Sequence, residues 1–307
     1  MTDVRGPALA LLACLPISCG GPAEPPAVSD IVAEARQLDL SGQHEPAVAR
    51  YREALALAPD DFDAHYGIGR ALDLAGQYDE AREHFSKAVA LAPPELREQA
   101  MRMLGIAWTF AGRADQAAPW FEQVFTRRRD AGDRAGAAEV ANELGRVHLE
   151  LGDLDRAETW YRSGFETAQT TGRTPAQVDL AELRWTHAQA RIAARRGDHD
   201  RALAYAAEVR EVLNRGTNPG EERPYQYLVG YLALVRGDAA GAVEALQKAD
   251  LDDPFNAFLL ADAHARLDHD AIARDLYQTV LASASHGVGA AFVREEARRR
   301  LAGSGTR

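Results

Sequence analysis

Small and large apolar side chains recur along the chain at fixed offsets, with polar and charged residues between them. In the segment 74–93, LAGQYDEAREHFSKAVALAP, Gly76 is followed five positions later by Ala81 and then by Phe85, and a proline closes the stretch. The segment 40–59, LSGQHEPAVARYREALALAP, has the same frame. A frame that returns in this way predicts a repeated structural unit, and such a repeat decides the fold before any single motif does.

The glycine–alanine pair returns through the body of the chain, and a seventh copy has Asp268 in place of the glycine. The six complete pairs are Gly42/Ala47, Gly76/Ala81, Gly112/Ala117, Gly152/Ala157, Gly197/Ala202 and Gly237/Ala242. A large residue follows the alanine by four positions at Tyr51, Phe85, Phe121, Tyr161, Leu246 and Tyr277, whereas the fifth copy has Ala206. A small residue lies seven positions before the glycine site at Ala35, Gly69, Gly105, Gly145, Ala190, Gly230 and Ala261.

Each copy is predicted to be two antiparallel helices. The glycine ends the first helix, because it adopts the left-handed conformation without a steric penalty. The small residues allow the two helix axes to approach closely, and the large residue is expected to fill the space against the neighbouring unit. Pro59, Pro93 and Pro254 are expected to end the second helix of their copies, because proline cannot donate the backbone hydrogen bond.

This frame resembles the tetratricopeptide repeat family over about residues 28–280. The resemblance implies an all-α fold, an α-solenoid of about seven helix-turn-helix repeats in a right-handed superhelix with a concave groove. Copies three to five are spaced more widely and resemble the longer-helix variants of the family. Residues 281–307 are expected to form a capping helix, at GAAFVREEARRRLA (289–302), followed by a disordered tail.

Composition supports a fold of many close-packed helices and argues against several classes of function. The 307 residues are 46% hydrophobic and 26% charged but only 7% aromatic, and alanine, the best helix former, is frequent. The net charge of −11 gives no support to a nucleic-acid role. Cys14 and Cys19 are the only cysteines, which excludes a disulfide scaffold or a cysteine zinc site in the body of the chain.

The N-terminus is predicted to be a targeting segment. An apolar run from Pro7 to Ile17, too short to span a bilayer, is followed by Ser18, Cys19 and the Gly/Pro-rich residues GGPAEPP. Residues 1–18 resemble a bacterial lipoprotein signal peptide, which implies lipidation of Cys19, with residues 19–27 as a tether. Cys14 is a rival lipidation site. A plain secretory signal and a chance apolar start are the other interpretations.

No set of side chains indicates catalysis, a metal site or a cofactor, so we expect a non-enzyme without cofactors. GIGRAL (67–72) lacks the third glycine of a dinucleotide loop and is predicted to lie inside a helix. His264 and His269, with acids nearby, could suggest a metal site, but a solvated helix end is the simpler interpretation. DDFDAH (60–65) is predicted to be a turn in which aspartates cap the next helix.

In the family, the first helix of each repeat lines the concave groove, so the resemblance implies a peptide-binding strip. The residue after the small position is arginine in four of the first five copies. The full set of expected groove residues is Arg36, Arg70, Arg102, Asn142, Arg146, Arg184, Arg191, Arg195, Tyr227, Tyr231 and Phe258. Such a basic row could focus an acidic partner segment that also has apolar residues. The alternative is that these arginines pair with acids of adjacent repeats, such as Asp73, Glu139 or Glu143.

We therefore expect a protein–protein interaction scaffold in a bacterial cell envelope, anchored by its N-terminal lipid. In a Gram-negative cell it would lie on the periplasmic side of the outer membrane. Its partner would be a protein or peptide segment rather than nucleic acid. The alternatives are an accessory or small-ligand-binding subunit of an envelope enzyme or transporter, and a cytoplasmic adaptor if the N-terminal signal is misread.

Overall fold

The structure, a computed structural model, describes residues 26–169 and 173–303, and over these residues it contains helices and no strands. The first eight helices are α1 (Val28–Leu40), α2 (His44–Leu57), α3 (Phe62–Ala75), α4 (Tyr78–Leu91), α5 (Arg97–Phe110), α6 (Ala114–Asp130), α7 (Arg134–Leu151) and α8 (Leu154–Ala168). The others are α9 (Pro175–Arg195), α10 (His199–Leu213), the short 3-10 helix η1 (Pro219–Glu221), α11 (Glu222–Arg236), α12 (Ala239–Leu246), α13 (Pro254–Ala265), α14 (Asp270–Ala282) and α15 (Val288–Gly303).

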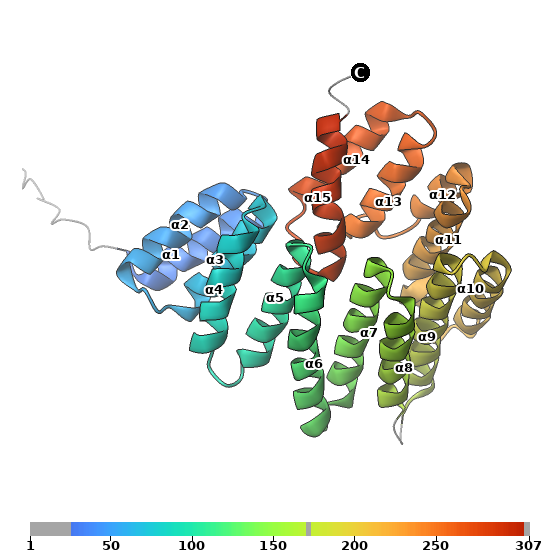
Figure 1. The fold of residues 1–307 in the computed structure, drawn as a ribbon, viewed down its shortest axis with the longest axis horizontal. Coiled ribbons are helices and arrows are strands. Elements are labelled where there is room, and N and C mark those ends of the chain that lie inside the picture. Colours follow the sequence, from blue (N-terminus) through green and yellow to red (C-terminus); the bar gives the residue numbers. More distant parts are fainter. Residues whose placement is uncertain (1–25, 170–172, 304–307) are drawn as a thin grey trace, which may run out of the picture.

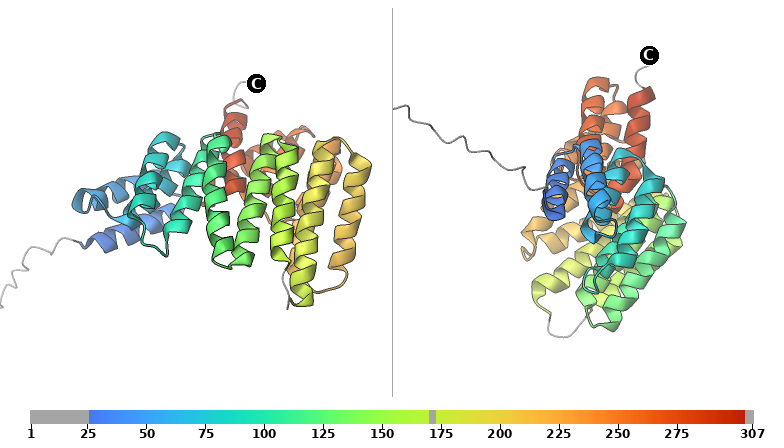
Figure 2. Two further views of the ribbon diagram at one scale, coloured as in Figure 1. Left: turned by 60° about the horizontal axis from the view of Figure 1, so that its bottom comes forward. Right: turned by 90° about the vertical axis from the view of Figure 1, so that its left-hand side faces the viewer.

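Helices α1 to α14 form seven consecutive pairs, which we number as repeats one to seven. Each helix packs mainly on the helices before and after it in the chain, as a stack of repeats requires. The stack follows one arc from α1 to α14, and it brings repeat seven back towards the first half of the molecule (Figure 1). Figure 2 shows the helices of the middle repeats standing side by side.

The turn inside each repeat has the backbone conformation that the sequence predicts. Gly76, Gly152 and Gly237 follow α3, α7 and α11 with φ of 89°, 83° and 85°, and the other three glycines of the frame also have positive φ. Asp268, which replaces the glycine in repeat seven, has φ of 58° and is the one non-glycine residue with positive φ in the described chain. The position therefore requires the left-handed conformation whichever residue occupies it.

The small and large residues of the frame pack on each other inside one repeat. A Cβ atom added at Gly145 would lie 2.7 Å from the ring of Tyr161, and one added at Gly69 would lie 2.9 Å from the ring of Phe85. At Phe85 and Tyr161 the large side chain therefore covers the missing side chain of its own repeat, which lets the two helices approach. The expectation that the large residue fills space against the neighbouring unit is confirmed at Tyr51 of α2, whose ring packs on Gly67 of α3 in the next repeat.

Two of the three prolines end helices as predicted. Pro59 and Pro93 follow α2 and α4 closely, which end at Leu57 and Leu91. The prediction for Pro254 was wrong, because this residue begins α13, and α12 ends earlier, at Leu246. Proline suits the first turn of a helix, since the amide it lacks would have no intrahelical partner there.

Helix α15 does more than cover the end of the stack. It packs on α13 and α14 of repeat seven, but also on α5 and α7 of repeats three and four. In Figure 1 it lies between these two parts of the arc. Val288 and Ala291 belong to the apolar core of repeats two to four, whereas Val293 and Ala297 belong to the core of repeats five to seven. Helix α15 therefore joins the two halves of the molecule across the concave side.

None of the described helices combines the length and the apolar character needed to cross a membrane. Cys14, Cys19 and the expected signal and tether, up to residue 25, lie outside the described residues. The expected tail lies outside them from residue 304 onward.

Candidate functional site: the open half of the concave groove

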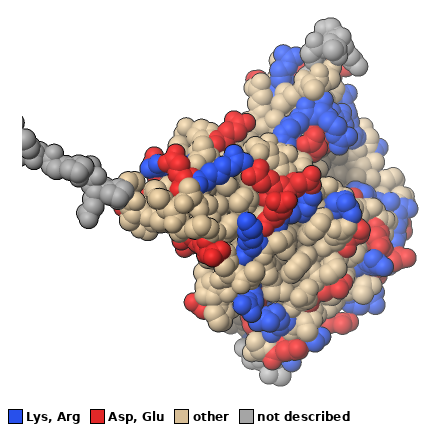
Figure 3. Space-filling view, turned by 60° about the vertical axis from the view of Figure 1, so that its left-hand side comes forward, with Lys and Arg blue, Asp and Glu red and all other residues tan. Residues whose placement is uncertain are grey.

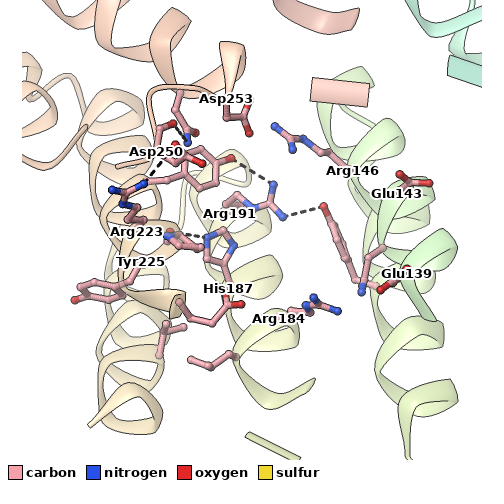
Figure 4. Close-up of a pocket in the computed structure, with 18 of the residues that line it drawn as sticks. Glu139, Glu143, Arg146, Arg184, His187, Arg191, Arg223, Tyr225, Asp250 and Asp253 are labelled. Atoms are coloured by element: carbon pink, nitrogen blue, oxygen red, sulfur yellow. Dashed lines mark hydrogen bonds and ion pairs between the residues drawn. The ribbon is translucent and has the colours of Figure 1, made fainter. Parts of the chain in front are cut away.

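A cavity of about 770 Å³ opens on the concave side between α7, α9, the start of α11 and the segment 250–256 (Figure 4). We call it the groove cavity. Six of the predicted groove residues line it, namely Arg102, Asn142, Arg146, Arg184, Arg191 and Tyr227. These residues belong to repeats three to six. Positions that the repeat frame predicted to face the groove therefore do line one cavity, although they are far apart in the chain.

Arg191 is the most buried arginine of the cavity, with 6% of its surface exposed. Its guanidinium donates a hydrogen bond of 2.8 Å to the hydroxyl of Tyr161 and a longer one of 3.5 Å to that of Tyr227. It also lies over the rings of both tyrosines, 5.4 Å and 6.0 Å from their centroids. Among the described residues, no carboxylate lies within ion-pair distance of it. Arg191 is thus held by neutral groups, and its Nε has no partner there.

His187 adds an aromatic surface to the cavity. Its ring stacks on Tyr227 with 5.5 Å between centroids, and its Nε2 donates to the carbonyl oxygen of Pro224 at 3.4 Å. Burial, and then the nearby charge of Arg191, hold the pKa of His187 well below its usual value. The imidazole is therefore neutral at physiological pH, and the arginines carry the positive charge of this wall.

Arg146 and Arg184 face the same space from α7 and α9 (Figure 4). The guanidinium of Arg146 lies over the ring of Phe255, 4.5 Å from its centroid, and Arg184 is exposed. Neither makes an ion pair with a carboxylate of the described chain. Together with Arg191 they give the cavity three guanidinium groups that form no ion pair with a carboxylate in residues 26–169 and 173–303. We call these residues the arginine trio.

Acidic residues also line the cavity, and two of them are paired with arginines outside the trio. Arg102 donates two hydrogen bonds to the carboxylate of Glu143, one of them 2.7 Å long. Arg223 lies 3.8 Å from Asp250. The interpretation that groove arginines pair with acids of adjacent repeats therefore holds for Arg102 and, outside this cavity, for Arg36, Arg70 and Arg195, but not for the trio.

The other predicted groove residues lie elsewhere. Arg36 is exposed and lies 3.6 Å from Asp63, and Arg195 lies 3.7 Å from Glu150. Arg70 forms an ion pair of 2.7 Å with the buried carboxylate of Asp39. Three residues, Arg195, Tyr231 and Phe258, line a smaller cavity of about 300 Å³ beside Phe255. The predicted strip is thus divided among the groove cavity, this smaller cavity and the N-terminal repeats.

Sequence reasoning missed three residues that shape the groove cavity. Tyr161 was recognised only as a packing residue, yet its hydroxyl holds Arg191. His187 and Phe255, which stack on Tyr227 and under Arg146, were not singled out. His187 lies on the same first helix as Arg184 and Arg191, three and four positions away, so helical spacing could have found it.

Two interpretations that set aside other chemistry agree with the structure. Residues 67–72 lie inside α3, and Asp61 caps this helix by accepting the amide of Ala64 at 2.7 Å. The expectation of a solvated helix end was wrong for His264, which is buried, whereas His269 is exposed; their Nδ1 atoms are 3.1 Å apart. Within residues 26–169 and 173–303, no group of three or more His, Cys, Asp or Glu side chains is placed to hold a metal ion.

Comparisons with known proteins agree on the repeat. Two tetratricopeptide repeat models match consecutive parts of the chain, at residues 32–95 and 96–170. No curated protein matches the chain in sequence. A tetratricopeptide repeat protein from Parabacteroides merdae has a similar structure, with a TM-score of 0.54 and 11% identity over 90% of this chain and 97% of that one.

Two further solved structures are similar. The apo form of RapI has a TM-score of 0.54 and 11% identity, over 90% of this chain and 99% of that chain. Tetratricopeptide-like repeats from Podosopora anserina, described as a kinesin light chain, have a TM-score of 0.51 and 18% identity, over 62% of this chain and 96% of theirs. Neither the family models nor these structures indicate an enzyme family. Residues 32–170 are tetratricopeptide repeats, and the described chain folds as an α-solenoid of such repeats.

Proposed function

We propose that this protein is a non-catalytic interaction scaffold that binds an acidic segment of a partner protein in the groove cavity. The arginine trio carries the proposal, since three guanidinium groups face one cavity and none of them forms an ion pair with a carboxylate in the described part of the chain. A buried charge without a counter-charge is costly, and a bound carboxylate would remove part of that cost. Guanidinium groups also hold carboxylates through paired hydrogen bonds, which gives direction as well as attraction.

The same segment is proposed to place apolar side chains in the smaller cavity. Phe255 connects the two cavities, because Arg146 of the groove cavity lies over its ring and the ring also lines the smaller cavity. Phe258 and Phe292 line the smaller cavity as well. Tyr227 and Tyr231 are mostly buried in the protein core and support the site more than they contact a ligand.

A labelled hexaglutamate peptide is a defined probe of the trio. We expect saturable binding that weakens with added salt, because part of the attraction is screened. Arg146→Gln together with Arg184→Gln should weaken binding by about tenfold or more, since a hydrogen bond to a charged group contributes about 1.5–3 kcal/mol. Fluorescence anisotropy measures both effects.

Two controls make this experiment decisive. Arg36→Gln removes an exposed arginine far from the groove cavity and should leave affinity unchanged. Hexaglutamine should not bind. Equal binding of hexaglutamine, or an unchanged affinity in the double variant, would show that the trio is not the binding surface.

A small-ligand-binding role is the second candidate, and the size of the groove cavity favours it. A volume of about 770 Å³ lies in the range of small-molecule sites, and its walls combine aromatic rings with many charged groups. Free glutarate distinguishes the two roles. If glutarate binds as tightly as the peptide, the small ligand is favoured, whereas much weaker binding favours the protein segment.

The membrane anchor belongs to the same proposal. Lipidation of Cys19 would hold the solenoid at the surface of a bacterial envelope membrane, and the apolar run followed by Ser18, Cys19 and a Gly/Pro tether supports it. Cys19→Ala is expected to release the protein from the membrane fraction or to block processing, while Cys14→Ala keeps the mature form. Membrane association and mass that do not change in Cys19→Ala would contradict this anchor and would favour the secreted or cytoplasmic alternatives.

A further inference from the structure

Residues 284–291 occupy the concave strip of repeats two to four, where the family resemblance predicted a peptide. Arg70 of α3 donates to the carbonyl oxygen of Ala284 at 3.0 Å. Ile106 of α5 lies in the same apolar core as Ala290. A Cβ atom added at Gly289 would lie 2.9 Å from the guanidinium of Arg146. Arg70 and Arg146, which follow the small position in repeats two and four, therefore meet the chain's own C-terminal segment, and Ile106 of repeat three shares its apolar core.

The concave strip of repeats two to four offers acceptor groups to basic side chains, whereas the groove cavity presents basic side chains itself. Asp73, with a fully buried side chain, lies 2.8 Å from Nε2 of His286. The carbonyl oxygen of Leu74, at the end of α3, accepts hydrogen bonds from Arg294 at 3.0 Å and from Arg298 at 2.9 Å. The last carbonyls of a helix lack intrahelical partners and carry partial negative charge, so they favour cations.

The contacts of α15 with α3 and α4 depend on two arginines spaced four residues apart. Arg294 and Arg298 are four residues apart, so they lie on one face of α15 and reach the same carbonyl oxygen. Arg298 also donates to the hydroxyl of Tyr78 at 2.7 Å. Basic side chains gather at the upper part of the molecule, where α15 ends (Figure 3). A helix with arginines four residues apart fits this surface.

The buried apolar part of the contact consists mainly of small side chains. Val288, Ala290 and Ala291 are the buried residues of α15 in the core of repeats two to four. The His286 ring stacks on Phe110, with 4.8 Å between centroids, and the partly buried Phe292 packs against the same core. Burial of alanine side chains contributes little compared with leucine or phenylalanine, so polar contacts give this interface much of its specificity.

We propose that the concave strip of repeats two to four is a docking surface for a basic amphipathic helix of a partner, and that residues 283–303 occupy it as an exchangeable intramolecular ligand. The acceptors Asp73 and Leu74 carbonyl and the apolar strip around Ile106 form the surface. The arginines at positions 294 and 298 show the chemistry of its ligand. This surface shares Arg146 with the groove cavity, but its acceptors, Asp73 and the Leu74 carbonyl, lie outside that cavity, so the proposal does not depend on the function proposed there.

The test uses the full chain and a labelled synthetic peptide of residues 283–303. In the variant His286→Ala, Arg298→Ala, the chain's own α15 is held less tightly. We expect this variant to bind the peptide at least tenfold more tightly than the wild type does. A peptide in which both Arg294 and Arg298 are replaced by glutamine should not bind. Arg299→Ala, at an exposed arginine of the same helix, should behave as the wild type.

Hydrogen exchange of the wild-type protein gives a second measurement that needs no variant. If α15 leaves its docking surface as proposed, amides of 291–301 should open at least about a hundredfold more often than those of α5 and α7.

Three outcomes decide against the proposal or redirect the test. Equal protection of these helices, or no peptide binding by a folded variant, would show that α15 is a fixed part of the core. If the double variant loses its cooperative fold, Tyr78→Phe, which removes only the hydroxyl that Arg298 contacts, replaces it. Tyr78→Phe must then also bind the peptide at least tenfold more tightly than the wild type does. A dimer formed by helix exchange would assign the surface to a second copy and overturn the proposal.

Discussion

Gly145 leaves no room for a side chain, because the ring of Tyr161 lies 2.7 Å from the position a Cβ atom would take. Gly145→Leu should therefore separate α7 from α8, and overpacking of this kind costs about 1–3 kcal/mol. Tyr161 also holds Arg191, so the trio should be displaced and hexaglutamate affinity should fall with stability. The midpoint of urea unfolding, followed by circular dichroism, measures the first effect.

Gly220→Leu is the matched control for this prediction. Gly220 is exposed, and nothing lies within 4 Å of the position of its missing Cβ atom. The control should unfold at the same urea concentration as the wild type. If Gly145→Leu does the same, the close approach of α7 and α8 is not required for stability.

At the scale of the helix, α9 has the clearest start signal in the chain and carries two residues of the trio. Thr174 accepts the amide of Gln177 at 3.3 Å, and the side chain of Gln177 accepts the amide of Thr174 at 2.9 Å. Thr174→Ala removes this reciprocal cap and should cost about 1 kcal/mol, because amides of the first turn lose their partner. Hydrogen exchange in the first turns of α9 should increase.

Thr159→Ala provides the comparison for the cap. The hydroxyl of Thr159 bonds to a carbonyl within its own helix, at Asp155, so its removal leaves no helix end open. We expect wild-type exchange in α9 for this variant. Unchanged exchange in Thr174→Ala as well would show that tertiary packing, rather than the cap, fixes the start of α9.

Local features of the elements were predictable from sequence, and features that depend on several elements were not. The positive φ at Asp268 follows from the frame alone, because the helix must end there whichever residue is present. The groove positions of Arg146 and Arg191 also follow from the frame. Which arginine meets a carboxylate depends on neighbouring repeats, so the Arg102–Glu143 pair and the isolation of Arg191 needed the structure.

The position of α15 could not be predicted, because it depends on the curvature summed over seven repeats. The sequence of 289–302 indicates an amphipathic helix, and α15 occupies Val288–Gly303. A small change in the angle between successive repeats would carry repeat seven away from repeat two. The contact between His286 and Asp73 is therefore a property of the whole arc.

For the whole molecule, several buried histidines predict loss of stability in acid. Burial, and then the charge of His65, lower the pKa of His84 to about 4, and burial also lowers the pKa values of His148, His187 and His264. In the unfolded chain these groups titrate near 6.5, so the unfolded state takes up more protons between about pH 6.5 and 4. Stability should therefore be complete above about pH 7 and fall as the pH drops through this range.

The urea midpoint at pH 7.5 and at pH 5 tests this prediction. We expect a decrease in the free energy of unfolding on the order of 1–3 kcal/mol, since one pKa unit corresponds to about 1.4 kcal/mol. Asp73, whose pKa burial raises, opposes the trend. His84→Gln should reduce the difference between the two pH values, and Ser86→Ala on the same helix should not. Equal midpoints at both pH values in the wild type would refute the buried-histidine explanation.

The bridge made by α15 also sets an order of assembly. His286 and Asp73 are 213 residues apart, whereas a repeat otherwise depends on its immediate neighbours. Contacts of such long range form slowly, because a long loop must close before they contribute. During synthesis, repeats two to four emerge with Asp73, Phe85 and Phe110 uncovered on their concave side, and they stay so until residues 286–298 follow. We expect this interval to be the time at which a helper protein, or a competing basic helix, has its best access to the chain.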